Sequence, residues 1–265
     1  VDYQADVSMG QNILKQVSDN YRKVRNTFRF LMANLDNNEF SKKDCIPFDQ
    51  LNALNQYILV LLKDASDFVI KAYKEYRFSD VVSYLSNLMT NDLSAYYLDY
   101  TKDILYIENV DSLSRREVQT VLYTAVDVLA KLWSPILCHT CEEINVFMHF
   151  NSESIHLESF DDLQLNFNGK DIKDKMKVLF EIRKDVFKAL EEKRADKLIG
   201  KPLEAKVLLH VSEQQKAVID EMLDNVPQWF TVSQVEFVQD TLPSYEVCQV
   251  QVEKAQGSVC PRCWN

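Results

Sequence analysis

FDQLNALNQYILVLLKDASDFVIKAYKEYR, residues 48–77, decides the fold class of this chain. Its apolar side chains recur at steps of three and four residues, the spacing that places them on one face of an α-helix. They are Leu51, Leu54, Ile58, Leu61, Leu62, Phe68, Val69 and Ala72. Neither glycine nor proline interrupts the stretch, so we expect one long helix with a buried face.

The same spacing recurs on both sides of this stretch. In residues 9–36 it gives an apolar stripe about 80° wide, formed by Val17, Tyr21, Val24, Phe28, Leu31 and Leu35. Further helices are expected at 78–89, 93–106, 111–133 and 135–150. Residues 1–150 are therefore predicted to form a helix bundle with short connections.

The pattern changes after residue 150. Residues 151–171 are acidic, polar and irregular, which predicts a linker, and residues 172–200 predict a connecting helix that ends at Gly200. Apolar residues then alternate at 203–211, 230–238 and 245–252, around a short helix at 212–223. This predicts a small α/β module over 201–253. Since the helix bundle and the connecting helix make up most of the chain, the expected fold class is mainly α.

Composition excludes several classes of protein. The chain has 265 residues and only 4 glycines, where average usage would give roughly 18. It contains no GxGxxG or Walker loop and no GxSxG or HExxH motif, so we expect no catalytic residues here. It also has no apolar stretch long enough for a membrane span, and no signal peptide. Its first residue is not Met, so we expect an excised fragment. Its six cysteines are spread unevenly and form no disulfide framework, which predicts a cytoplasmic protein, and we expect a monomer.

A basic run near the N-terminus is the first candidate binding feature. In YRKVRNTFRF, residues 21–30, four cations occur without an acid. On a helix the three arginines share one sector with an asparagine and an earlier lysine, and the full set is Lys15, Arg22, Arg25, Asn26 and Arg29. Such side chains pair with phosphates and base edges, which favours RNA or another anionic partner. A solvated helix face is the alternative, and the net charge of −10 argues weakly against nucleic acid.

The second candidate is CPRCWN, residues 260–265. Cys260 and Cys263 have the CxxC spacing at which two thiolates bind one zinc ion, and such a site normally needs a second pair. Residues 254–265 are thus predicted to be the first half of a zinc-binding element, with zinc absent from this half site alone. A redox pair and an incidental pair are the alternatives. Arg262 and Trp264 suit stacking on an unpaired base.

Two other features have plainer interpretations. Cys138 and Cys141 lie three residues apart in an expected helix, which indicates small residues at a helix contact rather than a metal site. Residues 170–206 hold 12 cations against 8 anions, so this stretch is locally basic. Alternation of acids and lysines is equally typical of a solvated helix.

Several blocks of this sequence resemble a known family. YRKVRNTFRFLMANL (21–35) resembles the start of the anticodon-binding domain of class I aminoacyl-tRNA synthetases of the isoleucine, valine and leucine group. Three longer blocks look like the isoleucyl family specifically: 91–106, 119–144 and 186–207. The terminal CPRCWN looks like the first half of the C-terminal zinc element of its bacterial members, and the second cysteine pair of that pattern is missing.

The resemblance implies a function for the chain and for a longer parent. The parent would attach isoleucine to tRNA(Ile) with ATP, using catalytic and editing domains that this sequence does not contain. The chain would recognise the anticodon stem-loop and would be inactive alone, without an ATP site. The resemblance also places Arg22, Arg25, Asn26 and Arg29 where the family meets tRNA, and makes Cys260 and Cys263 zinc ligands, with Arg262 and Trp264 near the anticodon loop.

Two rival functions stay open. A helical protein-interaction scaffold would agree with the acidic total charge. The anticodon region of a valyl or leucyl relative would share the basic first helix, although a valyl relative would be expected to end in a coiled coil, and residues 200–265 do not have that pattern.

Overall fold

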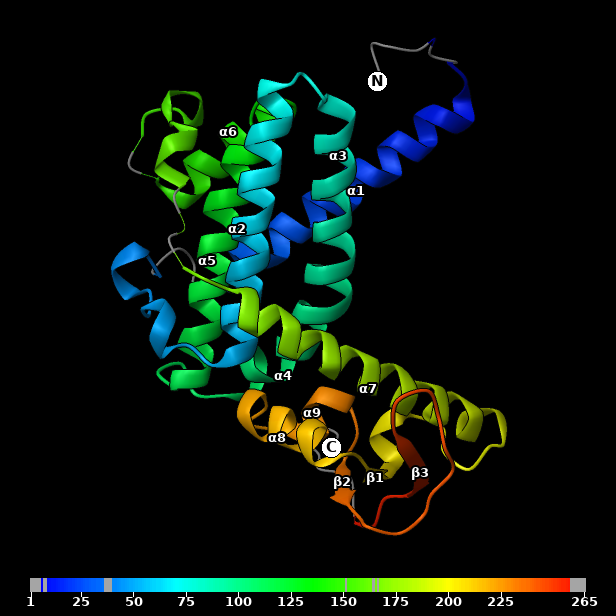
Figure 1. Ribbon diagram of the computed structural model, residues 1–265. Coiled ribbons are helices and arrows are strands. Elements are labelled where there is room, and N and C mark those ends of the chain that lie inside the picture. The colour runs from blue at the N-terminus through cyan, green and yellow to red at the C-terminus, as the bar shows by residue number, and fades with distance from the viewer. Residues whose placement is uncertain are drawn as a thin grey trace. The chain divides into compact units, whose positions relative to one another are not determined.

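The computed structural model contains two compact units (Figure 1). The first comprises residues 1–51 and 58–168, and the second comprises 52–57 and 169–265. The residues that the structure describes are 6, 9–35, 40–150, 152–163, 165 and 167–257. Among them, no helix is both long enough and apolar enough to cross a membrane.

The first unit is a helix bundle, as the apolar spacing predicts. Its long helices are α1 (Gln11–Ala33), α2 (Ala53–Lys74), α3 (Phe78–Asn87), α4 (Leu98–Ile107), α5 (Leu113–Trp133) and α6 (Cys138–Met148). Residues 53–57 of α2 are grouped with the second unit. Short helical turns occur at η2 (Lys42–Asp44), η3 (Phe48–Gln50), η5 (Ile155–Leu157) and η6 (Phe160–Leu163).

Helix α5 is the centre of this bundle. It begins after Ser112, whose hydroxyl accepts a hydrogen bond from the backbone N–H of Arg115 and so caps the helix. Thirteen of its residues are buried, and it packs against α1, α4 and α6. Near its end, the indole N–H of Trp133 lies 3.2 Å from the sulfur of Met89. A helix covered on most sides needs the predominantly apolar composition that 118–133 has.

A π-helix joins α3 to α4, where the sequence predicts a break between two helices. This segment, η4 (Leu88–Tyr97), carries the chain from α3 into α4 without a loop. In π-helical turns each N–H bonds to the carbonyl five residues back, so the turn is wider than in an α-helix. Leu93 and Tyr97 are buried there, and desolvation raises the pKa of Asp92.

The stripe of α1 is covered only in its second half. Val24, Phe28, Leu31 and Leu35 are buried as predicted. Val17 is 60% exposed and Tyr21 38% exposed, which corrects their expected burial. The reason is that the first half of α1 projects from the bundle (Figure 1), so its apolar face is left largely uncovered there.

The second unit packs helices against a small sheet. Its helices are α7 (Lys170–Ala195), α8 (Glu213–Met222) and α9 (Val226–Phe230), with a short turn at η7 (Pro202–Glu204). Its strands are β1 (Ala205–His210), β2 (Gln234–Phe237) and β3 (Gln249–Lys254), in the order β2-β1-β3. Strand β1 is parallel to β2 and antiparallel to β3, and α7 packs against α8, α9 and β3.

A buried carboxylate ties α7 to the chain before β3. Asp185 is 2% exposed. Its Oδ2 accepts hydrogen bonds from the backbone N–H groups of Val247, at 2.7 Å, and Cys248, at 3.2 Å. Because a buried polar group must be satisfied, this acid and these two amides depend on one another.

The structure differs from the expected elements at further places. The single helix expected over 48–77 begins only at Ala53, after the separate short turn η3. The expected strand over 230–238 begins only at Gln234, because Asn225 caps the short helix α9. The stretch 151–171, expected as a linker, includes two helical turns whose Ile155 and Leu163 are buried. Residues 258–265, which include the CxxC pair, lie outside the described residues.

Candidate nucleic-acid interface

Helix α1 presents its predicted binding residues to solvent. Its buried residues are Val24, Thr27, Phe28 and Leu31. The five predicted residues are all exposed and lie on the opposite side of the helix: Lys15, Arg22, Arg25, Asn26 and Arg29. Lys15 is 14 residues from Arg29, which is about 21 Å along the axis. The set therefore forms a long cationic face rather than a compact pocket.

Two of these arginines already have acidic neighbours. The Arg25 guanidinium lies 2.9 Å from a Glu143 oxygen on α6 and donates a hydrogen bond to the Tyr21 hydroxyl at 3.3 Å. Arg22 lies 3.4 Å from Asp19 one turn earlier. Both ion pairs are exposed, and exposed ion pairs contribute little to stability because water screens their charges. A phosphate can therefore replace either carboxylate at small cost.

A second contact fixes α1 against α6. The hydroxyl oxygens of Tyr21 and Thr140 are 2.9 Å apart. Hydrogen bonds from Thr140 and then Arg25 lower the pKa of Tyr21. Arg25, through Tyr21 and Glu143, thus helps to hold α1 against α6.

A groove of about 190 Å³ lies between α1 and α6. Arg25, Arg29 and Glu143 line it together with Phe147, which is 48% exposed, and with Phe28, Met32, Thr140 and Ile144. Arg29 makes no ion pair with the residues that the structure describes. An unpaired guanidinium beside an exposed ring can bind a phosphate and stack on a base.

A second groove, of about 400 Å³, lies on the other side of α1. It is lined by Lys23, Asn26, Thr27 and Phe30 of α1, by Thr90 and Ser94 of η4, and by Leu98 and Lys102 of α4. The hydroxyl oxygens of Thr27 and Ser94, which both line this groove, are 2.9 Å apart. Two ammonium groups on facing helices with hydroxyls between them suit a sugar-phosphate backbone.

The structure does not bring every predicted residue together. Cys260, Arg262, Cys263 and Trp264 lie outside the described residues. Within the described part of the chain, no three or more His, Cys, Asp or Glu side chains are grouped to hold a metal ion. In α6, Cys141 is buried as expected for a helix contact, and burial raises its thiol pKa to about 12, but Cys138 is exposed.

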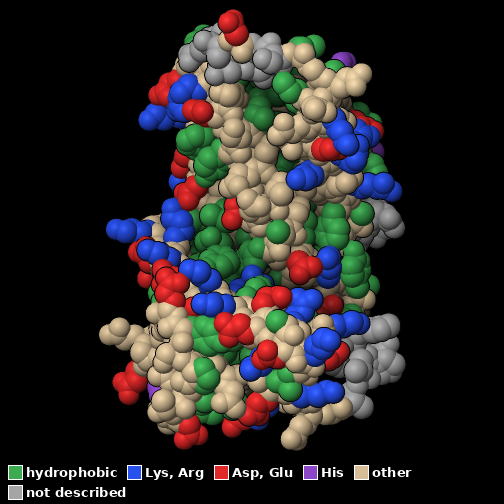
Figure 2. Space-filling view, turned by 90° about the vertical axis from the view of Figure 1, so that its right-hand side faces the viewer, with side chains coloured by type: hydrophobic (Ala, Val, Ile, Leu, Met, Phe, Trp, Pro, Cys, Tyr) green, Lys and Arg blue, Asp and Glu red, His purple; other side chains and the backbone are tan. Residues whose placement is uncertain are grey.

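Sequence reasoning missed two cations of the second groove. Lys23 stands inside the basic run but points away from the main sector of α1, towards η4. Lys102 is 79 residues further along the chain, and only the packing of α4 brings it there. On the face shown in Figure 2, acidic and basic side chains are interspersed, so the net charge of −10 does not describe any one site there.

The comparisons with known proteins identify the family. The family described as the anticodon-binding domain of tRNA ligase matches residues 55–209. This chain belongs to that family, which confirms the class expected from the sequence. The matched part runs from the first turns of α2 to β1, so α1 lies before it.

Three relatives are similar over nearly the whole chain. The isoleucine–tRNA ligase of Listeria monocytogenes is 40% identical, that of Bacillus cereus 39% and that of Persephonella marina 38%. The alignments cover 99%, 100% and 99% of this chain, respectively. The chain spans 29% of the length of each of these relatives.

Proposed function

We propose that this chain is the tRNA-recognition part of an isoleucine–tRNA ligase and that it binds the anticodon stem-loop of tRNA(Ile). The observation that carries the proposal is the exposed cationic face of α1, with a groove on each side. Arg22 and Arg29 bind phosphates on this face, and Asn26 reaches towards one groove. The family match and the isoleucine–tRNA ligase relatives support RNA as the anion.

The mechanism of this part is to bind and orient rather than to catalyse. Cations neutralise RNA phosphates and release counterions, which supplies affinity without reading sequence. Polar and aromatic groups in the grooves contact unpaired nucleotides, which supplies selectivity. The parent enzyme then attaches isoleucine to the bound tRNA with ATP, in catalytic and editing domains outside this sequence. The chain alone is inactive in aminoacylation.

The proposal extends to organisation and setting. Residues 1–150 form the anticodon-binding bundle, 151–171 a connection, 172–200 the connecting helix and 201–253 the junction module. Cys260 and Cys263 would supply two thiolates to a zinc ion that needs a second pair of ligands, so the half site alone stays empty. Arg262 and Trp264 beside them contact the anticodon loop. The protein is a cytoplasmic monomer.

Binding of tRNA to the full 265-residue chain tests the proposal. The affinity for tRNA(Ile) is measured at several salt concentrations for the wild type and for the Arg22→Ala/Arg29→Ala variant. Each lost phosphate contact lowers the salt slope by about 0.7–0.9. Lys71→Ala is the matched control, because Lys71 is an exposed lysine on α2 outside both grooves.

The outcomes separate the rival functions. Weaker binding with a smaller slope in the double variant, and normal binding in the control, support the cationic face. Tighter binding of tRNA(Val) or tRNA(Leu) than of tRNA(Ile) points to the valyl or leucyl relative. Absence of saturable binding to all three tRNAs rejects RNA recognition and leaves the protein-interaction scaffold.

A further inference from the structure

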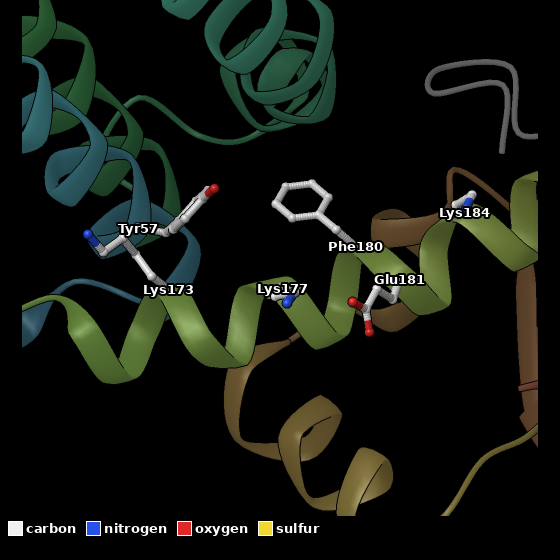
Figure 3. Close-up of a pocket in the computed structure, with 6 residues that line it drawn as sticks. All are labelled: Tyr57, Lys173, Lys177, Phe180, Glu181 and Lys184. Atoms are coloured by element: carbon white, nitrogen blue, oxygen red, sulfur yellow. The ribbon is translucent and has the colours of Figure 1, made fainter. Parts of the chain in front are cut away.

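The second unit contains a pocket that the cationic face of α1 does not include (Figure 3). Its volume is about 430 Å³, and its lining is mostly apolar with charged groups at the rim. The lining residues are Tyr57, Lys173, Lys177, Phe180, Glu181 and Lys184. A pocket of this size can hold a small planar ligand.

The pattern of α7 explains why these residues meet. Lys173, Lys177, Phe180 and Lys184 follow one another at steps of three and four and share one face of the helix. The opposite face is buried, with Met176, Leu179, Ile182 and Val186 at 0–1% exposure. Tyr57, from the first turns of α2, lies on the same side of α7 as Phe180 (Figure 3).

The two aromatic rings form a firm wall. The ring centroids of Tyr57 and Phe180 are 6.0 Å apart and the rings are tilted by 56°. Phe180 also contacts Trp229, with centroids 5.5 Å apart, and Trp229 is fully buried. Because Trp229 supports Phe180 and both pocket rings are only half-buried, the pocket presents an aromatic surface fixed in place.

The rim of the pocket is cationic. Three lysines and a single acid, Glu181, are among the residues that line it. Lys177 forms no ion pair with any residue that the structure describes. Lys184 lies 2.7 Å from Glu246, and both side chains are about 70% exposed (71% and 68%). That pair is therefore weak and can be exchanged for a phosphate.

We propose that this pocket binds one unpaired nucleotide of an RNA. The base stacks against Tyr57 and Phe180, and the adjoining phosphates bind Lys173, Lys177 and Lys184. Aromatic surfaces flanked by cations are how proteins hold single-stranded nucleic acid. An acidic peptide would use the lysines but would leave the aromatic wall without a planar partner. The inference rests on the proposed function, and all six residues lie within the matched family domain.

Affinity for tRNA(Ile) tests the lysines and the rings separately. Tyr57→Ala is expected to weaken binding about tenfold, the usual size of one lost base stack, while Tyr57→Phe keeps the affinity. Lys177→Ala is expected to lower the salt slope by about 0.7. Lys193→Ala is the matched control, since Lys193 lies on another side of α7 and outside the pocket. Thermal unfolding confirms that each variant is folded.

A crosslink locates the nucleotide directly. A tRNA(Ile) transcript carrying 4-thiouridine in place of uridine is irradiated on the full chain, and the labelled peptide is identified by mass spectrometry. Labelling of the peptide that contains Phe180, lost in Lys177→Glu, supports the proposal. Lys177 is exposed, so this variant tests the pocket even where Tyr57→Ala perturbs folding.

Three results overturn the inference. In the first, wild-type chain binds tRNA while Tyr57→Ala and Lys177→Ala bind equally well, which rejects the pocket and leaves the α1 face intact. In the second, polyglutamate displaces the RNA from the pocket but oligouridylate does not, which assigns the pocket to an acidic peptide. In the third, wild-type chain binds no tRNA, and then the proposed function fails first.

Discussion

Replacement of Asp185 by alanine removes the acceptor on which the chain before β3 depends. Asp185 lies on the buried side of α7 and is 2% exposed. Its Oδ2 accepts hydrogen bonds from the backbone N–H groups of Val247, at 2.7 Å, and Cys248, at 3.2 Å. Alanine leaves both amides without this acceptor. Water can reach Cys248 only by local opening, because that residue is 7% exposed.

The expected cost follows from this geometry. An unsatisfied buried amide costs about 1–3 kcal/mol, so two amides cost about 2–6 kcal/mol. Since 1.4 kcal/mol is a factor of ten, even the lower figure raises the population of the opened segment about 30-fold. Asp185→Asn keeps one carbonyl acceptor and is expected to show a smaller effect.

Hydrogen exchange measures this opening at the segment itself. We expect faster exchange in the peptide that spans residues 243–251 in Asp185→Ala, and an intermediate rate in Asp185→Asn. Asp174→Ala is the control, since Asp174 is an exposed acid on the same helix. Unchanged exchange at Val247 and Cys248 in Asp185→Ala would refute the argument that this carboxylate holds the segment.

Three further predictions concern burial. Leu129→Ala, in the fully buried face of α5, is expected to lower the free energy of unfolding by about 2–5 kcal/mol, and a change below 1 kcal/mol in denaturant unfolding contradicts it. Desolvation raises the pKa of Asp92, so the ionised carboxylate destabilises the folded state at pH values above that pKa. Asp92→Asn should therefore raise the melting temperature at pH 7. This gain should disappear as the pH falls below the raised pKa, which thermal melts at several pH values would show. Burial raises the pKa of the Cys141 and Cys248 thiols to about 12, so peptide mapping after iodoacetamide treatment at pH 8 should find exposed Cys138 alkylated well before either.

Residue spacing predicts which side of a helix is buried but not how much of that side is covered. The stripe of α1 has the same spacing at Val17 as at Leu31, yet Val17 is exposed and Leu31 is not. Coverage depends on where other helices cross, which only the tertiary structure defines. The same limit applies to Lys102, which lines one groove with Lys23 because α1 packs against η4, the segment that continues into α4.

Other differences had a local signal. Asn225 and Pro227 at the start of α9 are a helix cap and a first-turn proline, and they outweigh the alternation that suggested a strand. The lysines of α7 at steps of three and four could also be recognised as one face of a helix. The sequence does not show that Tyr57 lines the same pocket, because 116 residues separate Tyr57 from Lys173. No comparable residue pattern marks the π-helical segment.

That segment, η4, also affects how the bundle tolerates changes in chain length. Its wide turns hold more residues than α-helical turns of the same height. A one-residue deletion within residues 88–97 can therefore be absorbed by a return to α-helical bonding, with the faces of α3 and α4 kept in phase. Helix α5 has no wide turn that could shorten in this way. A one-residue deletion there would rotate one half of the buried helix by about 100° against the other half.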